Sequence, residues 1–154
     1  MKISFYQRGI TAIEILLVVS ILVVIAIVTV PSFVSFRKNQ ALQNTTNSVV
    51  SLLQEARAKT LGSYNNTFYS VYVDTSSATL FTGGTYSSVD TTNKTTPFES
   101  PVVLQSTTLL GGGAQVSFDR LKGTTAQSGT IVVGIPGGAS KTISVSASGV
   151  ISRD

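Results

Sequence analysis

Few residues of this chain have side chains that could perform chemistry. The 154-residue sequence contains no histidine and no cysteine, so it lacks the usual general base, thiolate nucleophiles, disulfides and Cys/His zinc ligands. Asp74, Asp90 and Asp119 are too dispersed to indicate a calcium-binding loop. No acid, base and nucleophile occur together in a pattern that indicates catalysis. We therefore expect a protein that is not an enzyme and that uses no metal or other cofactor.

The most distinctive ionisable residue is Glu14, which is the only charged residue between Ile10 and Val34. A lone carboxylate in such an apolar segment is costly in a membrane, roughly 2.5–3.5 kcal/mol on insertion scales. An anchor needs only apolar side chains, so this acid requires another reason. We expect a helix in which the carboxylate must find a partner.

The segment 10–34 is long enough to cross a bilayer. At 1.5 Å per residue it would form a helix of about 37 Å, against a hydrocarbon core of about 30 Å. Lys2 and Arg8 precede it, so the positive-inside rule predicts a cytoplasmic N-terminus and a head outside. Arg37 and Lys38 somewhat oppose this orientation.

The helical pattern continues beyond the apolar segment. Pro31 lacks an amide hydrogen and should kink or loosen the helix locally, either to fit the helix to its own head or to let subunits pack and stretch. Residues 53–59 are strong helix formers, and Gly62 is a natural C-cap. We expect one helix from about Ile10 to Leu61, amphipathic in its second half. Its apolar stripe comprises Leu42, Val49, Val50, Leu53, Ala56 and Leu61.

The pattern changes after Gly62 to short β-branched and aromatic runs separated by glycine-rich turns. Residues 67–73 and 78–82 should form a hairpin, and residues 83–101 should form a long loop. Further strands are expected at 102–104, 115–119, 130–135, 141–146 and 150–152. An amphipathic helix and a one-sided sheet can bury each other's apolar face. The predicted fold class is α+β, a long N-terminal helix packed on an antiparallel β-sheet head.

The basic residues give a weak indication of nucleic-acid binding. The net charge is +4 from 11 basic and 7 acidic residues. Lys2 and Arg8 lie in the first nine residues, so the remainder carries 9 basic against 7 acidic residues, or +2. Arg120 and Lys122 are close in sequence, and Lys141 and Arg153 could join them in space. A nucleic-acid contact here competes with the simpler interpretation of solvated loop charges.

Residues 1–34 resemble the N-terminus of the type IV pilin superfamily. That family begins with a short basic leader ending in glycine. An aromatic residue or methionine follows, then threonine, leucine, isoleucine and glutamate, and then a long apolar helix that contains proline. The matching residues here are Gly9, Thr11, Ile13, Glu14 and Pro31. Two residues depart from the pattern: Ile10 stands where phenylalanine or methionine is usual, and Ala12 where leucine is usual.

The resemblance implies a division of the chain and a processing site. Residues 1–9 would be a leader, 10–34 a membrane and filament-core helix, 35–62 an amphipathic continuation, and 63–154 the head. A prepilin peptidase would cut between Gly9 and Ile10 and methylate the new amine of Ile10. That amine is largely positive at neutral pH, so Glu14 of one subunit could pair with the amine of its neighbour and set the axial register.

The head resembles, more loosely, the H-type (GspH/FimT-like) pseudopilins and minor pilins. The relevant features are the helix end at 55–58, the strand patterns at 116–119 and 129–133, and the closing run 142–151. The resemblance implies a structural subunit of a type IV pilus or type II secretion system. Its partners would be prepilin peptidase, other pilin subunits, the inner-membrane assembly platform and membrane lipid before assembly. Alternatives are a major type IV pilin and a DNA-binding minor pilin of an uptake system.

Overall fold

The computed structural model describes residues 9–154, except for the side chains of residues 28–32. It divides into two compact units, one ending at Arg37 and one comprising Lys38–Asp154, and each is described by itself. Helix α1 (Ala12–Leu61) contributes to both units. A short 3₁₀ helix, η1 (Tyr64–Asn66), follows it, and all the strands come after η1. The leader predicted at residues 1–9 lies, apart from Gly9, outside the described residues.

The first sheet has the strand order β3-β2-β1-β5 and is antiparallel throughout. Its strands are β1 (Tyr69–Val73), β2 (Ser77–Thr82), β3 (Lys94–Pro97) and β5 (Gln115–Ser117). β1 and β2 form the predicted hairpin, with Val71 opposite Leu80. On the outer face, Tyr86 from the loop after β2 stacks on Tyr72 and contacts Phe81 edge-on. These aromatic contacts hold the loop against the sheet.

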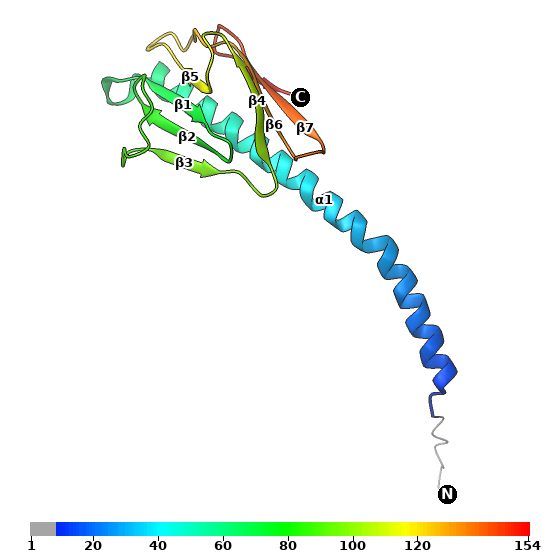
Figure 1. The fold of residues 1–154 in the computed structure, drawn as a ribbon. Coiled ribbons are helices and arrows are strands. Elements are labelled where there is room, and N and C mark those ends of the chain that lie inside the picture. The colour runs from blue at the N-terminus through cyan, green and yellow to red at the C-terminus, as the bar shows by residue number, and fades with distance from the viewer. Residues whose placement is uncertain (1–8) are drawn as a thin grey trace, which may run out of the picture. The chain divides into compact units, whose positions relative to one another are not determined.

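The second sheet has the order β4-β6-β7-β8 and is also antiparallel. Its strands are β4 (Val103–Leu109), β6 (Gly129–Gly134), β7 (Ser140–Val145) and β8 (Ile151–Arg153). β6 and β7 alternate buried and less buried residues, as expected for strands with one face on a core. Both sheets lie against the second half of α1 (Figure 1). The prediction of an N-terminal helix on antiparallel β-structure in an α+β fold is therefore confirmed.

One hydrophobic core joins α1 to both sheets. From the helix, Leu42, Val49, Leu53 and Ala56 are buried as the apolar stripe predicted. Leu61 differs, because 38% of its surface is exposed at the end of the helix. Outside the helix, the largest fully buried apolar side chains are those of Phe118, Ile131, Ile143, Val71, Val73, Val116 and Val133.

Buried threonines of α1 fasten the helix to backbone groups of the head. The hydroxyl of Thr60 accepts a hydrogen bond from the amide of Tyr69 at 2.8 Å. The hydroxyl of Thr45 accepts one from the amide of Glu99 at 3.1 Å. Both threonines are buried, so these bonds satisfy amides that water does not reach easily. The helix is thus attached by directional bonds near both ends of its buried stretch.

Three details of the predicted head were wrong. The single sheet is two sheets, and the loop predicted at 83–101 contains strand β3. β3 shows no apolar alternation because it is an edge strand with mostly exposed residues. It pairs with β2 as an antiparallel strand, and the hydroxyls of Thr79 and Thr95 add a cross-strand bond at 3.0 Å. The left-handed residue after α1 is Ser63 (φ 49°), while Gly62 continues the helical hydrogen bonds through its amide to Ala58 at 3.0 Å.

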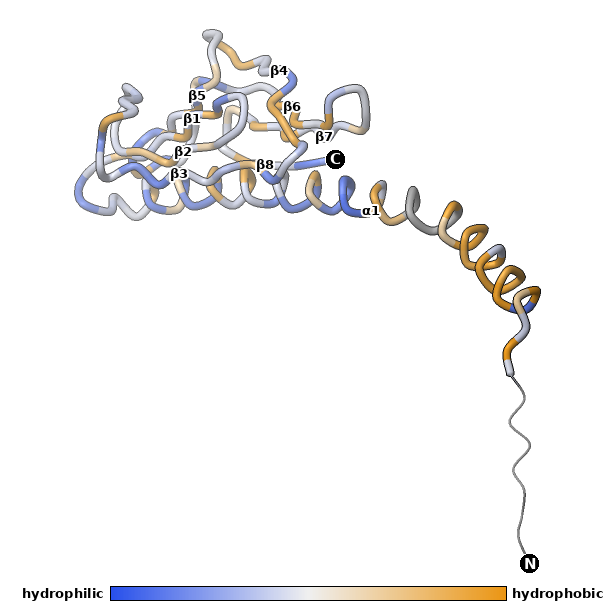
Figure 2. Tube along the Cα trace, turned by 60° about the horizontal axis from the view of Figure 1, so that its bottom comes forward, coloured by the Kyte–Doolittle hydropathy of each residue, from blue (hydrophilic) through white to orange (hydrophobic). Residues whose placement is uncertain are grey.

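In the unit that ends at Arg37, the helix surface is apolar and open. Figure 2 shows the first turns of α1 dominated by hydrophobic residues. Every large apolar side chain described in this part of α1 is exposed, among them Ile13 at 73% and Ile27 at 69%. Among the residues that the structure describes, no helix is both long enough and apolar enough to cross a membrane.

Candidate functional site

Gly9 and Ile10 lie in exposed, non-helical backbone immediately before α1. Nothing lies within 4 Å of the position that a Cβ on Gly9 would occupy. An extended, uncovered segment with a glycine can enter a protease cleft more easily than a folded one. Among the described residues, nothing covers the bond between Gly9 and Ile10, as cleavage there would require.

Thr11 caps the start of α1, a role that the sequence interpretation missed. Its side-chain oxygen accepts a hydrogen bond from the amide of Glu14 at 3.3 Å, and its carbonyl accepts bonds from Glu14 at 3.1 Å and Ile15 at 3.3 Å. The signal was available, because Thr11-x-x-Glu14 has the spacing of a capping box. Glu14 also lies in the first helical turn, where the helix dipole favours an acid.

Glu14 is exposed and surrounded by apolar side chains. Together with Ile10, Ile15, Val18 and Val19 it borders a shallow hollow of about 260 Å³ on the helix surface. No basic side chain of the chain occurs between Ile10 and Phe36. Within α1, the first basic side chains are therefore those of Arg37 and Lys38, more than six helical turns from Glu14.

Pro31 lies within the continuous assignment of α1. Its side chain is one of those at residues 28–32 that the structure does not describe, so the predicted kink at Pro31 is not tested. Both interpretations of this proline remain predictions.

Arg120 holds the turn that follows α1. Its Nε donates to the hydroxyl of Ser63 at 2.7 Å, and its terminal nitrogen donates to Oδ1 of Asn66. Ser63, Asn65 and Asn66 all have positive φ, a conformation that costs energy for residues other than glycine. The guanidinium thus has a structural partner at a strained turn, so part of its hydrogen-bonding capacity is already used.

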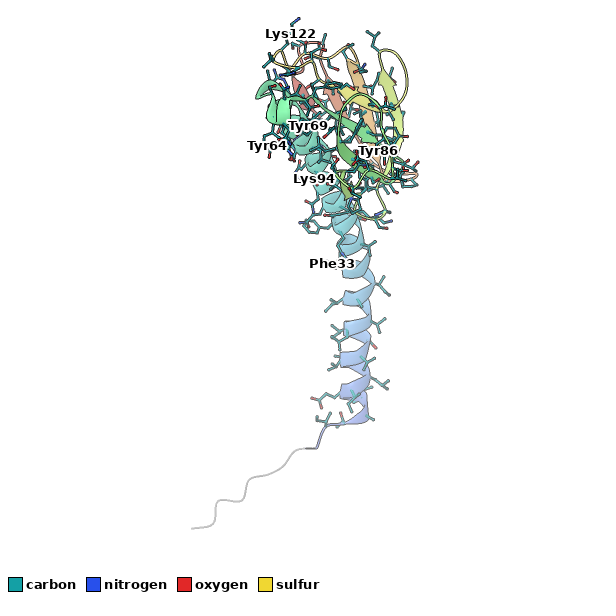
Figure 3. The ribbon with its side chains drawn as sticks, turned by 90° about the vertical axis from the view of Figure 1, so that its left-hand side faces the viewer. Phe33, Tyr64, Tyr69, Tyr86, Lys94 and Lys122 are labelled. Carbon is teal, nitrogen blue, oxygen red and sulfur yellow. The ribbon has the colours of Figure 1, made fainter. Side chains whose placement is uncertain are left out.

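Lys122 is exposed in the neighbouring loop and labelled at a margin of the head in Figure 3. The loop is closed by bonds from the amides of Lys122 and Gly123 to the carbonyl of Asp119, at 3.3 and 2.8 Å. It meets the turn after β7, where the amide of Thr125 donates to the carbonyl of Ala147.

The structure does not gather the four basic residues considered in the sequence. Lys141 lies near the start of β7, six residues before Ala147, which corresponds to roughly 20 Å of strand. Its ammonium donates to the carbonyl of Asp154 at 2.9 Å. Arg153 is in β8, paired with Ile143. Arg120 and Lys122 therefore form one group and Lys141 and Arg153 another.

Arg57 connects α1 to two turns. Its Nε donates to the carbonyl of Gly123 at 3.1 Å and a terminal nitrogen to the carbonyl of Ser148 at 3.4 Å. Gly149 packs between these groups: a Cβ there would lie 1.9 Å from the carbonyl oxygen of Gly123 and 2.9 Å from Nε of Arg57. The glycine is required both by this close approach and by its φ of +75°.

Glu55 binds two lysines on the surface of the head. Its carboxylate contacts Lys59 at 2.8 Å, one helical turn away, and Lys94 of β3 at 2.7 Å. Hydrogen bonds from the two ammonium groups, that of Lys59 having the larger effect and that of Lys94 the smaller, lower the pKa of Glu55. The same bond to Glu55 raises the pKa of Lys59. Lys59 also lies 5.3 Å from the centre of the Tyr69 ring. This group ties an edge strand to the helix.

The described part of the chain has few clustered acidic side chains. No group of three or more acidic side chains that could hold a metal ion occurs among its residues. Comparisons of this chain with protein-family models, with curated proteins and with solved structures found no match. The candidate functional features are therefore the exposed start of α1 with Glu14, and the surfaces of the head.

Proposed function

We propose that this chain is a structural subunit of the pilin type, a minor pilin or pseudopilin of a type IV pilus or type II secretion system. A prepilin peptidase cuts it between Gly9 and Ile10. The chain waits in the cytoplasmic membrane with its head outside, and it then assembles with other subunits through its N-terminal helix. The observation that carries this proposal is the exposed Glu14 on an otherwise apolar and uncovered helix surface.

The uncovered surface supports assembly because it needs a partner. Exposed large apolar side chains run along α1 from Ile13 to Phe36, far more than a solvated monomer usually presents as one patch. Bundling such helices removes this surface from water at a gain of about 25 cal/mol per Å². Apolar burial alone does not define an axial register, because one turn of the helix presents much the same surface as the next.

Glu14 supplies the register. In an apolar bundle its carboxylate is poorly solvated, so an arrangement that leaves it unpaired is costly. The amine of Ile10 created by processing is positively charged at neutral pH. A neighbouring subunit staggered along the axis brings its amine to this carboxylate in one register only. The ion pair acts mainly by penalising misaligned arrangements.

The capping contacts allow a second explanation of Glu14 that must be separated from the first. Thr11 stabilises the first turn of α1 by accepting a hydrogen bond from the backbone amide of Glu14, whether or not the chain assembles, an effect of about 1 kcal/mol for such caps. The Glu14 carboxylate adds a favourable interaction with the helix dipole. Thr11→Val removes the capping hydroxyl and keeps the carboxylate. Glu14→Gln removes the charge and keeps most of the side-chain shape.

The test is incorporation of chromosomal variants into filaments in the cells that express this chain. We expect Glu14→Gln and Glu14→Ala to lower the fraction of the chain in isolated filaments by about tenfold or more, the equivalent of about 1.4 kcal/mol. Thr11→Val should incorporate nearly normally. Equal defects in Thr11→Val and Glu14→Gln would favour the capping role and contradict the register proposal.

Processing is measured in the same samples. Mass spectrometry of the mature chain should find Ile10 at the N-terminus in the wild type and in all three variants. This control separates a failure of cleavage from a failure of assembly. A mature N-terminus at another residue would contradict the proposal as a whole.

A further inference from the structure

The edges of the two sheets differ in how they are protected from pairing with another chain. β3 carries Lys94 and Pro97, β4 has a register shift between Leu104 and Ser106, and the amide of Ser117 in β5 is bound by the side chain of Gln127 at 3.1 Å. Charges, proline, bulges and covering groups are the usual means of blocking an edge. Among the described residues, β8 has neither a bulge nor a proline, and no side chain binds the amides of Ile151 and Arg153; its one charged side chain is that of Arg153.

The hydrogen bonds of β8 show which backbone groups are open. The amide of Ser146 donates to the carbonyl of Val150 at 2.9 Å, and the amide of Asp154 donates to the carbonyl of Thr142 at 3.1 Å. In an antiparallel ladder, alternate residues direct both backbone groups toward the partner strand. Val150, residue 152 and Asp154 therefore face β7. Ile151 and Arg153 direct their amides and carbonyls to the free edge.

A groove between β8 and α1 runs beside this free edge. One part, of about 360 Å³, is lined by Asn47, Val50, Ser51, Gln54 and β8. A second part, of about 270 Å³, shares Gln54 and Ile151 with the first. It continues past Ala58 and Leu61 toward Val150. Figure 2 shows β8 beside the second half of α1. The groove has amide and hydroxyl groups on the helix side and an open strand edge on the other.

Each part of the groove has an arginine in its lining. Arg153 lines the first part and Arg57 the second, and no acidic side chain lines either part. The two ion pairs found in the described chain both involve Glu55 and neither arginine. Arg57 is bound only to backbone carbonyls, so its positive charge is not neutralised by an acid. The groove therefore favours a ligand with negative charge at both ends.

The stretch of groove between the two arginines suggests how those charges are spaced. Asn47 lines the same part as Arg153, and the helix residues from Asn47 to Arg57 cover about 15 Å at 1.5 Å per residue. That distance corresponds to between four and five residues of an extended strand. Two acidic residues four positions apart lie on the same face of a strand. An apolar residue midway between them meets Val50 and Ile151, which are both partly buried.

We infer that the groove between α1 and β8 binds an extended segment of a partner protein, added as a strand to β8, with two acidic residues four positions apart around an apolar one. The open backbone groups of Ile151 and Arg153 provide the main-chain bonds, and the two arginines provide selectivity for the acids. This inference concerns the head alone and does not depend on cleavage at Gly9 or on Glu14.

The probe is an acetylated heptapeptide of threonine with glutamate at its second and sixth positions and valine at its fourth. Full-length protein in detergent is titrated with the fluorescein-labelled peptide, and anisotropy is measured. We expect saturable binding that weakens when lysine replaces both glutamates. A peptide N-methylated at alternate amides should bind much less, because N-methylation removes the donors that a strand needs.

Two protein variants test the placement. Arg153→Glu should weaken binding roughly three- to tenfold, in line with loss and reversal of an exposed ion pair. Lys141→Glu makes the same charge change on the neighbouring strand outside the groove and should bind within about twofold of the wild type. In hydrogen-exchange NMR, the amides of Ile151 and Arg153 should become protected when peptide is added.

Three results would overturn the inference. The first is no saturation up to about 1 mM peptide, the weak end of specific binding. The second is equal binding of the N-methylated peptide, because that would exclude strand addition. The third is an equal loss of affinity in Arg153→Glu and Lys141→Glu, which would show a general charge effect. Failure of filament assembly in Glu14 variants would leave each of these results unchanged.

Discussion

At the residue scale, the buried hydroxyl of Thr60 has a partner that cannot easily be replaced. It accepts a hydrogen bond from the amide of Tyr69 at 2.8 Å, and both residues are buried. Thr60→Val keeps the shape but leaves this amide unpaired, so we expect a loss of about 1–3 kcal/mol in the free energy of unfolding. Denaturant unfolding followed by circular dichroism measures it.

Thr46→Val is the matched control for that measurement. Thr46 is equally buried, but its hydroxyl donates to the carbonyl of Leu42 at 2.7 Å within its own helix. That carbonyl can also accept the regular helical bond, so its loss is less costly. Equal destabilisation in both variants would contradict the role assigned to Thr60.

Glu55 gives the head a dependence on acidic pH. Its pKa is lowered by Lys59 and Lys94, so its contribution is present above the unfolded pKa of about 4.3 and is lost as pH falls through the folded pKa. The carboxylate is about one-third exposed, so we expect only about 0.5–1 kcal/mol. The difference in unfolding free energy between wild type and Glu55→Gln should shrink as pH falls from neutrality to about 3.

A second carboxylate is the control for the pH measurement. Glu99 accepts hydrogen bonds from the side-chain amide of Asn44 at 3.1 and 3.2 Å, and it forms no ion pair with the described part of the chain. Glu99→Gln is therefore the matched substitution of a carboxylate outside the cluster of Glu55, Lys59 and Lys94. The raised pKa of Lys59 acts at the other extreme: its contribution is present below its unfolded pKa of about 10.4 and is lost as pH rises through the folded value.

At the scale of elements, the turn between β7 and β8 depends on a glycine with no space beside it. Gly149→Ala would combine a left-handed backbone with a clash against Gly123 and Arg57. Gly137 has a similar φ of +68°, but nothing lies within 4 Å of its Cβ position. We expect Gly137→Ala to cost about 1–2 kcal/mol, the left-handed penalty alone. Gly149→Ala should cost about 3 kcal/mol or more.

Thermal and denaturant unfolding of the two alanine variants provide the test. The physical reason for the difference is crowding, because both glycines adopt the left-handed region. Similar losses in the two variants would mean that the turn near Arg57 relaxes to admit a methyl group. The close packing of Gly149 would then not be required for the fold.

Sequence patterns predicted the elements that have strong local signals. Alternation identified the strands around Ile131 and Ile143, and helical spacing identified the buried residues Leu42, Val49 and Leu53. β3 was missed because its stability comes from pairing with β2 and from the bond between Lys94 and Glu55. Those contacts join residues far apart in sequence, and no local pattern specifies them. The division of the strands into two sheets could not be predicted for the same reason, because it also depends on pairing between residues far apart in sequence.

The candidate site shows the same limit. Glu14 was singled out as the one charge in an apolar segment, Gly9 was proposed from the family resemblance, and the cap at Thr11 could have been predicted from its spacing to Glu14. The bonds of Arg120 to the strained turn could not have been predicted in this way, because Ser63 and Asn66 are more than fifty residues away from it. The groove beside β8 could not have been predicted either, because it forms only when β8 lies next to α1 in the folded head.

At the scale of the whole molecule, the buried core belongs to one of the two units. Every residue of the hydrophobic cluster lies between Ala41 and Ile151, within the unit Lys38–Asp154. We therefore expect residues 38–154, produced alone, to be a monomer that unfolds cooperatively within a few degrees of the full chain in detergent. Light scattering and calorimetry measure these properties.

The same argument predicts how the unit that ends at Arg37 affects the full chain. The full chain without detergent should self-associate, because the apolar surface of the first unit is exposed. Aggregation or non-cooperative melting of residues 38–154 would contradict the assignment of the core to that unit. A full chain that stays monomeric without detergent would contradict the need for a covering partner.

The threonine bonds of α1 also determine how the head would respond to tension along the helix. Thr45 and Thr60 are fifteen residues apart, about 22 Å at 1.5 Å per residue, and each holds an amide of the head. A pull along the helix axis loads both attachments together, in shear, rather than opening one after the other. Sliding by one turn would also move Val49, Leu53 and Ala56 out of their places in the core. Such a head is suited to transmit axial force as a rigid body.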